Sequence, residues 1–191
     1  MIHRKGRRSA RRVAAAVLAI AGTLTGSLSV NAQSQSSSAP SEAFTNARAE
    51  YDRAWTESGL AFTVYTFTQA PSTGYGDYTP LEEASIAEGD SLSVYAEPVG
   101  YAFSNSNGEY AYKLTVSYKL LNMSGQVLAA QENFAQFEDT GRSKQHELSA
   151  ALTFQFSGLP AGNYQLEAVF QDEVGNQSAS FALPFTATAQ N

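Results

Sequence analysis

The clearest pattern along the chain is an alternation of apolar and polar residues between positions 109 and 125. One parity holds Tyr110, Tyr112, Leu114, Val116, Tyr118 and Leu120; the other holds Ala111, Lys113, Thr115, Ser117 and Lys119. A period of two places successive side chains on opposite faces of a strand, so this segment predicts a long strand with one buried and one solvated face. Turn-forming residues from Asn122 to Gly125 then predict a hairpin, with residues 126–132 as the returning strand.

The same alternation recurs in both directions along the chain. It predicts strands near residues 61–69, 91–98, 147–157, 164–170 and 181–185, with 99–104 as a continuation of the second after Pro98. Almost no helical periodicity follows residue 57, and parallel strands would need crossover helices. The pattern therefore predicts an all-β fold, an antiparallel β-sandwich of about seven or eight strands.

A short helix is predicted ahead of the strands, over residues 42–55. Phe44, Ala47, Tyr51 and Trp55 recur at helical spacing, and Ser41 is placed to cap the helix start. We interpret the aromatic stripe as a face that packs on the sandwich, with a partner-binding face as the alternative.

Residues 158–164 end in Gly-Asn-Tyr and lead into an alternating strand. This passage resembles the start of the penultimate strand in fibronectin-III-like and Ig-like domains, and the wider run 89–185 resembles uncharacterised bacterial secreted proteins with one such domain. The resemblance implies that Tyr164 forms a tyrosine corner, its hydroxyl bonded to backbone just upstream. It implies an Ig-like sandwich and no particular function, because this architecture carries many. The chain departs from antibody domains in having no cysteine, and its one tryptophan, Trp55, lies in the predicted helix.

The N-terminal segment has the organisation of a secretory signal peptide. Six basic residues within positions 4–12 precede an apolar run at 13–24, and the small residues around Ala32 match a cleavage site. An uncleaved anchor is the alternative. We expect export by the general secretory route to the periplasm or the medium. The predicted organisation is a signal peptide at 1–32, a flexible leader and short helix at 33–58, and the sandwich domain at 59–191.

Cleavage after Ala32 changes the charge of the protein. It leaves 6 Lys and Arg against 18 Asp and Glu, a net charge of −12. Such a surface repels phosphate backbones, so nucleic acid is a poor partner, and no membrane span is expected after cleavage. Without cysteine there is no disulfide or thiolate nucleophile, and only His146 remains after cleavage. No cofactor and no metal site is predicted.

The loop at 71–80 most resembles a binding site. Gly74 and Gly76 free its backbone, Tyr75 and Tyr78 offer flat amphipathic faces to a sugar or peptide, and Asp77 adds a hydrogen-bonding group. In the alternative, the tyrosines fold back to cover one end of a sheet and the glycines serve turns.

The remaining polar groups are interpreted mainly as solvated. The acidic run 82–90 does not have the ligand spacing of an EF-hand, and the acidic residues Asp172 and Glu173 next to Asn176 are likewise read as loop charge, with calcium binding left open. Glu97 is expected to face water or bond to a turn, with a buried base as the alternative. His146 lies among charges and is expected to be solvated.

No catalytic constellation emerges from the sequence, so no catalytic residue is predicted. The leading hypothesis is a non-enzymatic interaction module of the bacterial cell envelope that binds a protein or a glycan, with Tyr75, Asp77 and Tyr78 as the candidate ligand-binding residues. One alternative is a carboxylate-dependent hydrolase acting on a glycan through Glu83 or Glu88. The other is a structural protein that assembles by pairing of edge strands.

Overall fold

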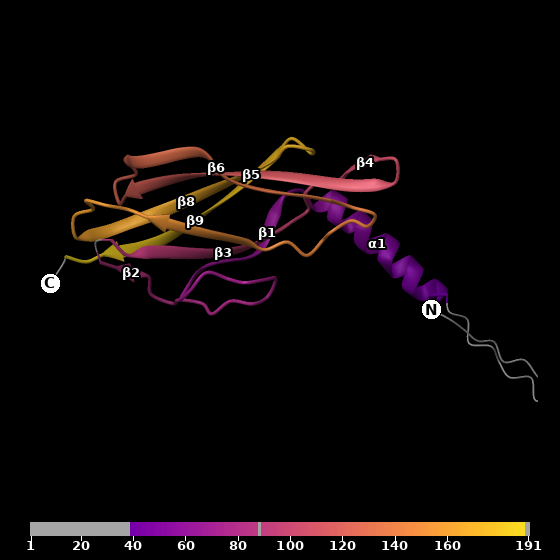
Figure 1. Ribbon diagram of the computed structural model, residues 1–191, viewed down its shortest axis with the longest axis horizontal. Helices are drawn as coiled ribbons and strands as arrows, with labels where there is room; N and C mark the ends of the chain where they lie inside the picture. Colours follow the sequence, from indigo (N-terminus) through magenta and orange to yellow (C-terminus); the bar gives the residue numbers. More distant parts are fainter. Residues whose placement is uncertain (1–38, 88, 190–191) are drawn as a thin grey trace, which may run out of the picture. The chain divides into compact units, whose positions relative to one another are not determined.

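The computed structural model describes residues 39–87 and 89–189. The predicted signal peptide, residues 33–38 of the predicted leader, and Glu88 lie outside the described residues. Within the described part, one helix precedes nine strands in two sheets that pack together (Figure 1). The predicted all-β sandwich with a short N-terminal helix is therefore confirmed.

The smaller sheet has the order β1–β3–β7, with β1 at Ala61–Thr68, β3 at Ser91–Val99 and β7 at Ala150–Gln155. The larger sheet has the order β2–β9–β8–β5–β4, with β2 at Ser85–Ile86, β9 at Gln177–Ala187, β8 at Gly162–Asp172, β5 at Glu109–Asn122 and β4 at Ser104–Ser106. Strand β6, at Val127–Gly141, pairs with β5. Neighbouring strands are antiparallel except β2 and β9, which are parallel.

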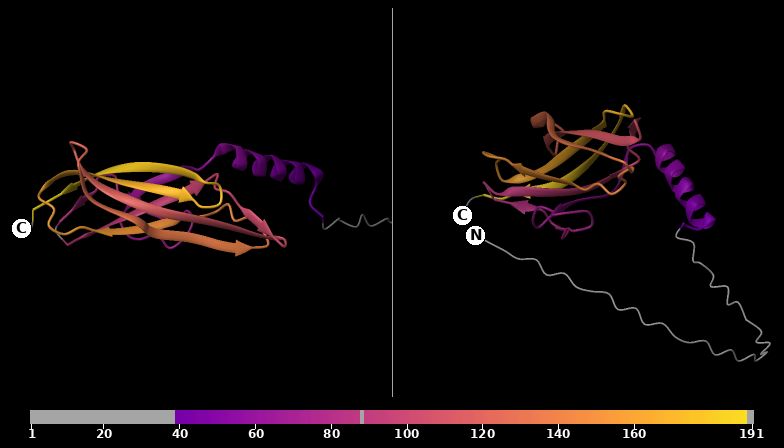
Figure 2. Two further views of the ribbon diagram at one scale, coloured as in Figure 1. Left: turned by 90° about the horizontal axis from the view of Figure 1, so that it is seen from above. Right: turned by 45° about the vertical axis from the view of Figure 1, so that its right-hand side comes forward.

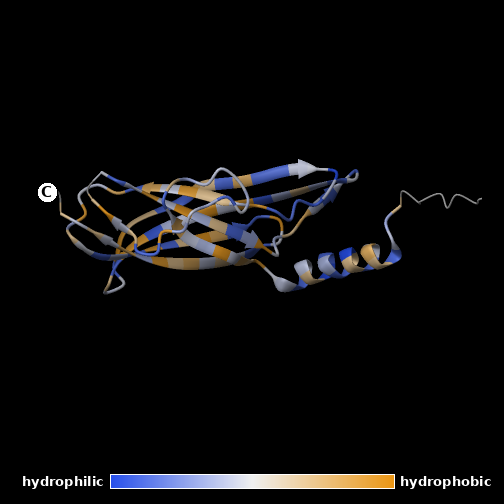
Figure 3. Ribbon diagram, turned by 90° about the horizontal axis from the view of Figure 1, so that it is seen from below, coloured by the Kyte–Doolittle hydropathy of each residue, from blue (hydrophilic) through white to orange (hydrophobic). Residues whose placement is uncertain are grey.

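The core lies between the sheets, where the alternating apolar residues meet. Leu114 and Val116 of β5 and Phe170 of β8 have no exposed surface. Figure 3 shows hydrophobic and hydrophilic residues alternating along the strands, as the period of two predicts. Each large apolar side chain buried in this way stabilises the fold by roughly 1.5–3 kcal/mol.

Aromatic contacts join the two sheets at both of their long margins. On one side, Phe62 of β1 lies 5.0 Å from the ring of Phe181 in β9. On the other, Phe134 of β6 stacks on Phe154 of β7 at 4.9 Å. These edge-to-face and stacked pairs add to the burial of the rings themselves.

Strand β6 is much longer than the predicted returning strand at 126–132. A wide bulge interrupts it, because residues 132–134 face Ser117 alone across the ladder. Asn133 adopts a φ of 50°, and its N–H donates to Ser117 Oγ at 3.1 Å. The bulge places Phe134 against the core. The second half of the strand was not predicted, because its acidic residues interrupt the alternation of apolar and polar positions.

The predicted continuation of β3 through 99–104 is wrong. Gly100 has a φ of 73°, and a Cβ there would collide with the carbonyl oxygen of Gly59. The chain turns at this glycine, crosses to the other sheet and begins β4 at Ser104. Only glycine fits both the left-handed backbone and the close approach.

Helix α1 covers Glu42–Ser58, and Ser41 caps it by accepting from the N–H of Phe44 at 3.2 Å, as predicted. The predicted packing face is wrong for most of its length: Phe44 is 56% exposed and Tyr51 51% exposed, while Trp55 is 7% exposed. Trp55 Nε1 donates to the carbonyl of Tyr101 at 2.8 Å. The helix therefore joins the sandwich through its last turns, and Figure 2 shows its N-terminal end running away from the sheets.

Candidate functional site

The loop at 71–80 lies over the outer face of the smaller sheet. Strand β3 is buried continuously from Leu92 to Pro98, although a strand with one wetted face should alternate. Its outward-facing Tyr95 has no exposed surface, because the ring of Tyr78 stacks on it at 4.1 Å. The N–H of Gly76 donates to Tyr95 Oη at 2.7 Å, so the loop is fixed to the strand by both stacking and hydrogen bonding.

A buried hydrogen-bond network continues from Tyr95 into the sheet. Its hydroxyl donates to one carboxylate oxygen of Glu97 at 2.6 Å, and Thr63 Oγ1 donates to the other at 3.0 Å. Glu97 is 8% exposed, so the expectation that it faces water is wrong; its two carboxyl oxygens each accept a hydrogen bond from a hydroxyl group. Burial, and next the hydrogen bond to Glu97, raise the pKa of Tyr95 to about 12.

The three predicted binding residues of this loop have different positions. Tyr78 is partly buried against Tyr95, as the covering alternative requires. Asp77 accepts a hydrogen bond from Thr73 and its N–H donates to the carbonyl of Gly74 at 3.2 Å, so it closes the turn of the loop. Tyr75 remains 47% exposed. The loop is thus a cover with one aromatic side chain left open.

The hydroxyl of Tyr75 lies in an acidic setting. Burial raises the pKa of Tyr75 first, and the nearby carboxylates of Glu97 and Glu147 raise it further, with a smaller contribution from Tyr51. Glu147 precedes β7 and Tyr51 belongs to helix α1, so the groups that raise the pKa of Tyr75 come from several parts of the chain.

An open groove of about 440 Å³ lies between helix α1 and the segment 144–147. It is lined by Arg48, Tyr51, Asp52, Lys144, Gln145, His146 and Glu147. Lys144 Nζ lies 3.3 Å from Asp52, so the charges of its walls are partly paired. The ring of Tyr51 is half exposed above it.

His146 lies between helix α1 and the sandwich, where its ring contacts aromatic residues of both. Its side chain is 15% exposed, and its ring lies 4.5 Å from Trp55 and 5.1 Å from Tyr51. The predicted solvated histidine is therefore wrong. Burial lowers the pKa of His146, against an opposing effect of Asp52, whose carboxylate lies 3.4 Å from Nε2 without a hydrogen bond.

Of the helix residues in this groove, the sequence interpretation named only Tyr51, in an aromatic stripe whose alternative role was to bind a partner. Tyr51 and Asp52 lie three and four residues after Arg48, so both are its neighbours on the helix surface. That spacing was a usable signal, but nothing local showed that the charged segment 144–147 would lie against it.

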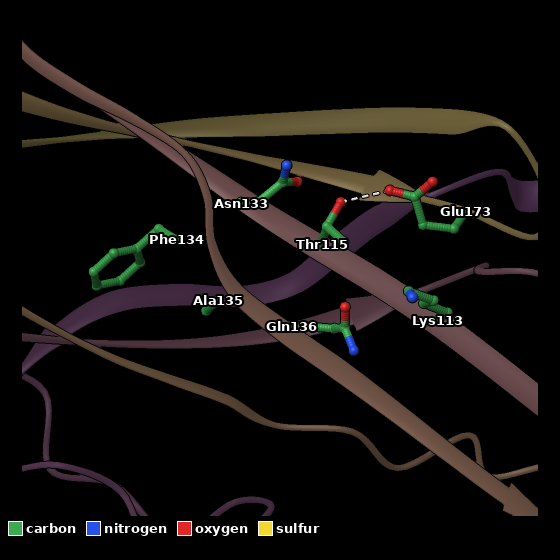
Figure 4. A pocket seen from close by; sticks show the side chains of 7 residues that line it. All are labelled: Lys113, Thr115, Asn133, Phe134, Ala135, Gln136 and Glu173. Atoms are coloured by element: carbon green, nitrogen blue, oxygen red, sulfur yellow. Dashed lines mark hydrogen bonds between the residues drawn. The ribbon is translucent and has the colours of Figure 1, made fainter.

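A second open groove, of about 690 Å³, lies on the outer face of the larger sheet (Figure 4). It is lined by Lys113, Thr115, Asn133, Phe134, Ala135, Gln136 and Glu173. Thr115 donates to Glu173 at 2.7 Å, and the bulge at Asn133 forms one wall. Its lining is mainly amide, hydroxyl and paired charge, without an exposed aromatic platform.

The acidic residues singled out in the sequence have different environments in the structure. Asp172 is fully buried, and its carboxylate accepts from the N–H groups of Ala102, Val174 and Gly175 at 2.8–3.0 Å. It is a structural residue that closes the β8–β9 turn, so its interpretation as solvated loop charge is wrong. Glu83 is exposed beside the short strand β2. No group of three or more His, Cys, Asp or Glu residues within 39–87 and 89–189 is placed to hold a metal ion.

Tyr164 lies at the start of β8, where the resemblance places it. Its hydroxyl donates to the carbonyl of Pro160 at 2.7 Å, four residues upstream, and its ring stacks on Phe185 at 5.6 Å. This bond holds the turn before β8 against the strand, so Tyr164 has a structural role.

Comparisons with models of known protein families and with curated protein sequences find no match to this chain. Among the described residues, no helix is both long and apolar enough to cross a membrane. The functional assignment therefore depends on the geometry of the site.

Proposed function

We propose that this chain is an exported, non-enzymatic binding module of the bacterial cell envelope, built on an Ig-like or fibronectin-III-like sandwich and delivered to the periplasm or medium by the general secretory route. Two features support the Ig-like assignment. The order β1–β3–β7 opposite β9–β8–β5–β6 corresponds to sheets A–B–E and G–F–C–C′ of such domains. The bond from Tyr164 to Pro160 has the geometry of a tyrosine corner.

The observation that supports the binding function is the exposure of the Tyr75 ring on a fixed loop. Its loop is fixed to β3 through Gly76 and Tyr78, yet its own ring is left 47% exposed. A rigid loop that presents an aromatic ring loses little conformational entropy on binding. The ring that covers Tyr95 is that of Tyr78, so the exposed part of the Tyr75 ring is free to contact a partner.

The groove beside α1 adds a second candidate surface and favours a protein partner. Tyr51 and Tyr75 offer exposed rings, and Arg48 stands at the groove wall. Tyrosine and arginine are the residue types that concentrate binding energy in protein interfaces. The acidic charge of the processed chain favours a partner with a basic surface, which it would attract at long range.

The test is capture of envelope proteins by the processed protein, purified after export, in parallel with a glycan array. We expect a specific protein partner whose affinity falls at least about tenfold, or about 1.4 kcal/mol, in Tyr75→Ala or Tyr51→Ala. Tyr65→Ala is the matched control, since Tyr65 is also 47% exposed but lies in β1, where it stacks on Phe181. Thermal unfolding of each variant separates loss of binding from loss of fold.

Three results would count against this function. A clean negative in both the capture and the array contradicts a binding module. Glycan binding that requires Tyr75 replaces the protein partner with a sugar. Hydrolysis of a glycan that disappears in Glu83→Gln would favour the carboxylate-dependent enzyme instead.

A further inference from the structure

Helix α1 is attached to the sandwich by few contacts. Trp55 is the only buried residue of the helix, and its Nε1 donates to the carbonyl oxygen of Tyr101 at 2.8 Å. A second contact joins the helix to the segment before β7, where Lys144 Nζ lies 3.3 Å from the carboxylate of Asp52. Elements held by few buried apolar groups separate from the rest of a fold at a small cost in free energy. The attachment of α1 is therefore sensitive to the charge of a single side chain.

His146 lies in the middle of this attachment. Its ring makes edge-to-face contacts with Trp55 of α1 at 4.5 Å and with Phe103, on the sandwich side, at 5.4 Å. The side chain is 15% exposed, and its Nε2 is buried without a hydrogen-bond partner. An imidazolium carries a full charge and two N–H donors, so burying it among aromatic rings costs more than burying the neutral ring. The interface therefore favours the neutral form of His146.

The charged groups of α1 and of the segment before β7 give a proton on His146 little net compensation. One carboxylate oxygen of Asp52 lies 3.4 Å from Nε2, but the other is paired with Lys144 at 3.3 Å. Arg48 of the helix and Glu147 line the same groove. Burial is the main cause that lowers the pKa of His146; Asp52 opposes this effect, and the two nearby cationic side chains add to it.

The groups that face His146 from the sandwich are aromatic and uncharged near neutral pH. The hydroxyl of Tyr101 donates to the carbonyl oxygen of Gln145 at 2.5 Å, and burial raises its pKa far above the ordinary value. Tyr51, on the helix, also has a raised pKa, first through burial and then through the carboxylates nearby. Both phenols therefore keep their protons in the range where a histidine titrates.

We propose that protonation of His146 releases helix α1 from the sandwich, so that this attachment is a pH-sensitive latch. The charged ring leaves its aromatic contacts for water, and Trp55 leaves with the helix. In the released form the ring has the ordinary histidine pKa of 6.5. Below this value the released form binds more protons than the attached form, so acid shifts the equilibrium toward release. The attachment has its full strength above pH 6.5 and weakens as the pH falls toward the lowered pKa of the attached ring.

Release of the helix also changes the groove beside α1. The walls of this groove are the helix and the segment 144–147, so they separate when the helix leaves. A loss of partner affinity on release rests on the proposed function of this groove. The release itself does not, and it is measured without a partner, so failure of one proposal is distinguishable from failure of the other.

The composition of the chain makes the latch directly measurable. Trp55 is the only tryptophan, so its fluorescence reports on the attachment. His146 is the only histidine of residues 33–191, and ordinary carboxyl groups titrate below about pH 5. In protein purified after export, we expect the emission of Trp55 to shift to longer wavelength as the pH falls from about 7.5 to about 5. Its quenching by acrylamide should rise at least about twofold over the same range.

His146→Phe is the main control, because it keeps an aromatic ring in the contacts and cannot take up a proton. Its Trp55 emission should match that of the wild-type protein at the higher pH and should not change at the lower pH. His146→Gln, which is neutral and polar, should also lose the pH response, even if the smaller side chain weakens the attachment at both pH values. The circular dichroism of the strands should stay constant, which separates release of the helix from unfolding of the sandwich.

Four results overturn the proposal. The first is a wild-type emission that does not change with pH. The second is an emission that is quenched but neither shifted nor more accessible to acrylamide, because a charged imidazole that stays in contact quenches an indole without release. The third is a response that persists in both His146 variants or that accompanies unfolding of the strands. The fourth is an NMR titration of the His146 ring with a pKa at or above the ordinary value of 6.5.

Discussion

The outer faces of the two sheets differ in whether other parts of the chain cover them. On the smaller sheet, the loop at 71–80 covers β3, and its polar groups are paired in a buried network around Tyr95 and Glu97. On the larger sheet, the outer face of β5 stays open and hollowed, with Thr115 and Glu173 paired in an exposed setting. One face is closed by the protein itself, and the other is left to solvent or to a partner.

This difference indicates where polar interactions stabilise the fold. A buried hydroxyl or carboxylate that loses its partner keeps the full cost of desolvation, whereas an exposed group exchanges its partner for water. The two exposed ion pairs on the larger sheet, Lys113 with Glu138 and Lys119 with Glu167, both span 3.7 Å and contribute little. The covered face should therefore tolerate polar substitution far less than the open one.

The largest effect is expected from Tyr95→Phe. This change removes the hydroxyl that accepts from Gly76 and donates to Glu97, and it leaves the buried carboxyl group of Glu97 without one of its two hydroxyl donors. We expect a loss of about 2–3 kcal/mol in the free energy of unfolding, measured by chemical denaturation.

The control for this variant is Tyr65→Phe in the neighbouring strand β1, where the ring is 47% exposed. It should cost less than about 0.5 kcal/mol. Equal losses in the two variants would mean that the network under the loop does not stabilise the covered face.

A smaller effect is expected at alkaline pH. Folded Tyr95 keeps its phenolic proton to a pKa of about 12, while the unfolded chain loses it near the ordinary tyrosine pKa of 10.0. Between these values the unfolded chain binds fewer protons, so the free energy of unfolding should fall as pH rises through this window. The contribution is fully present below pH 10.

Denaturation curves recorded across this window test the effect. The wild-type protein should lose stability more steeply than Tyr95→Phe, which lacks the ionising group but retains the other tyrosines. Parallel pH dependences in the two proteins would contradict a protonated Tyr95 hydroxyl as donor to Glu97.

The smallest effect is expected on the open face, from Thr115→Val. The substitution keeps the shape of the side chain and removes only the hydroxyl that donates to Glu173 at 2.7 Å. Because water replaces that bond, the free energy of unfolding should change by less than about 0.5 kcal/mol. A loss comparable to that of Tyr95→Phe would show that the two faces do not differ as proposed.

Much of the fold was predictable because it follows from local periodicity. The alternation around Leu114 and Val116 predicted β5, and the helical spacing that ends in Trp55 predicted α1 with its cap at Ser41. The hairpin after Asn122 was predictable from turn chemistry. The second half of β6 was not, because an edge strand with a bulge has no regular buried face.

The site was predictable only in part. Residue types at 71–80 singled out the loop, and Tyr75 is exposed there. The sequence could not distinguish it from Tyr78, because the difference is the contact of Tyr78 with Tyr95, in another segment. Glu97 and His146 were misjudged for the same reason: the groups that bury them come from distant parts of the chain.

The sequence by itself determined which segments are strands and which of their faces is apolar, since both are properties of neighbouring residues. The tertiary structure alone decided which polar face is covered, which tyrosine stays open, how little of α1 packs, and which edge remains free. Burial depends on what lies nearby in space, and for Tyr95, Glu97 and His146 those neighbours are brought in by the loop 71–80, β1 and α1.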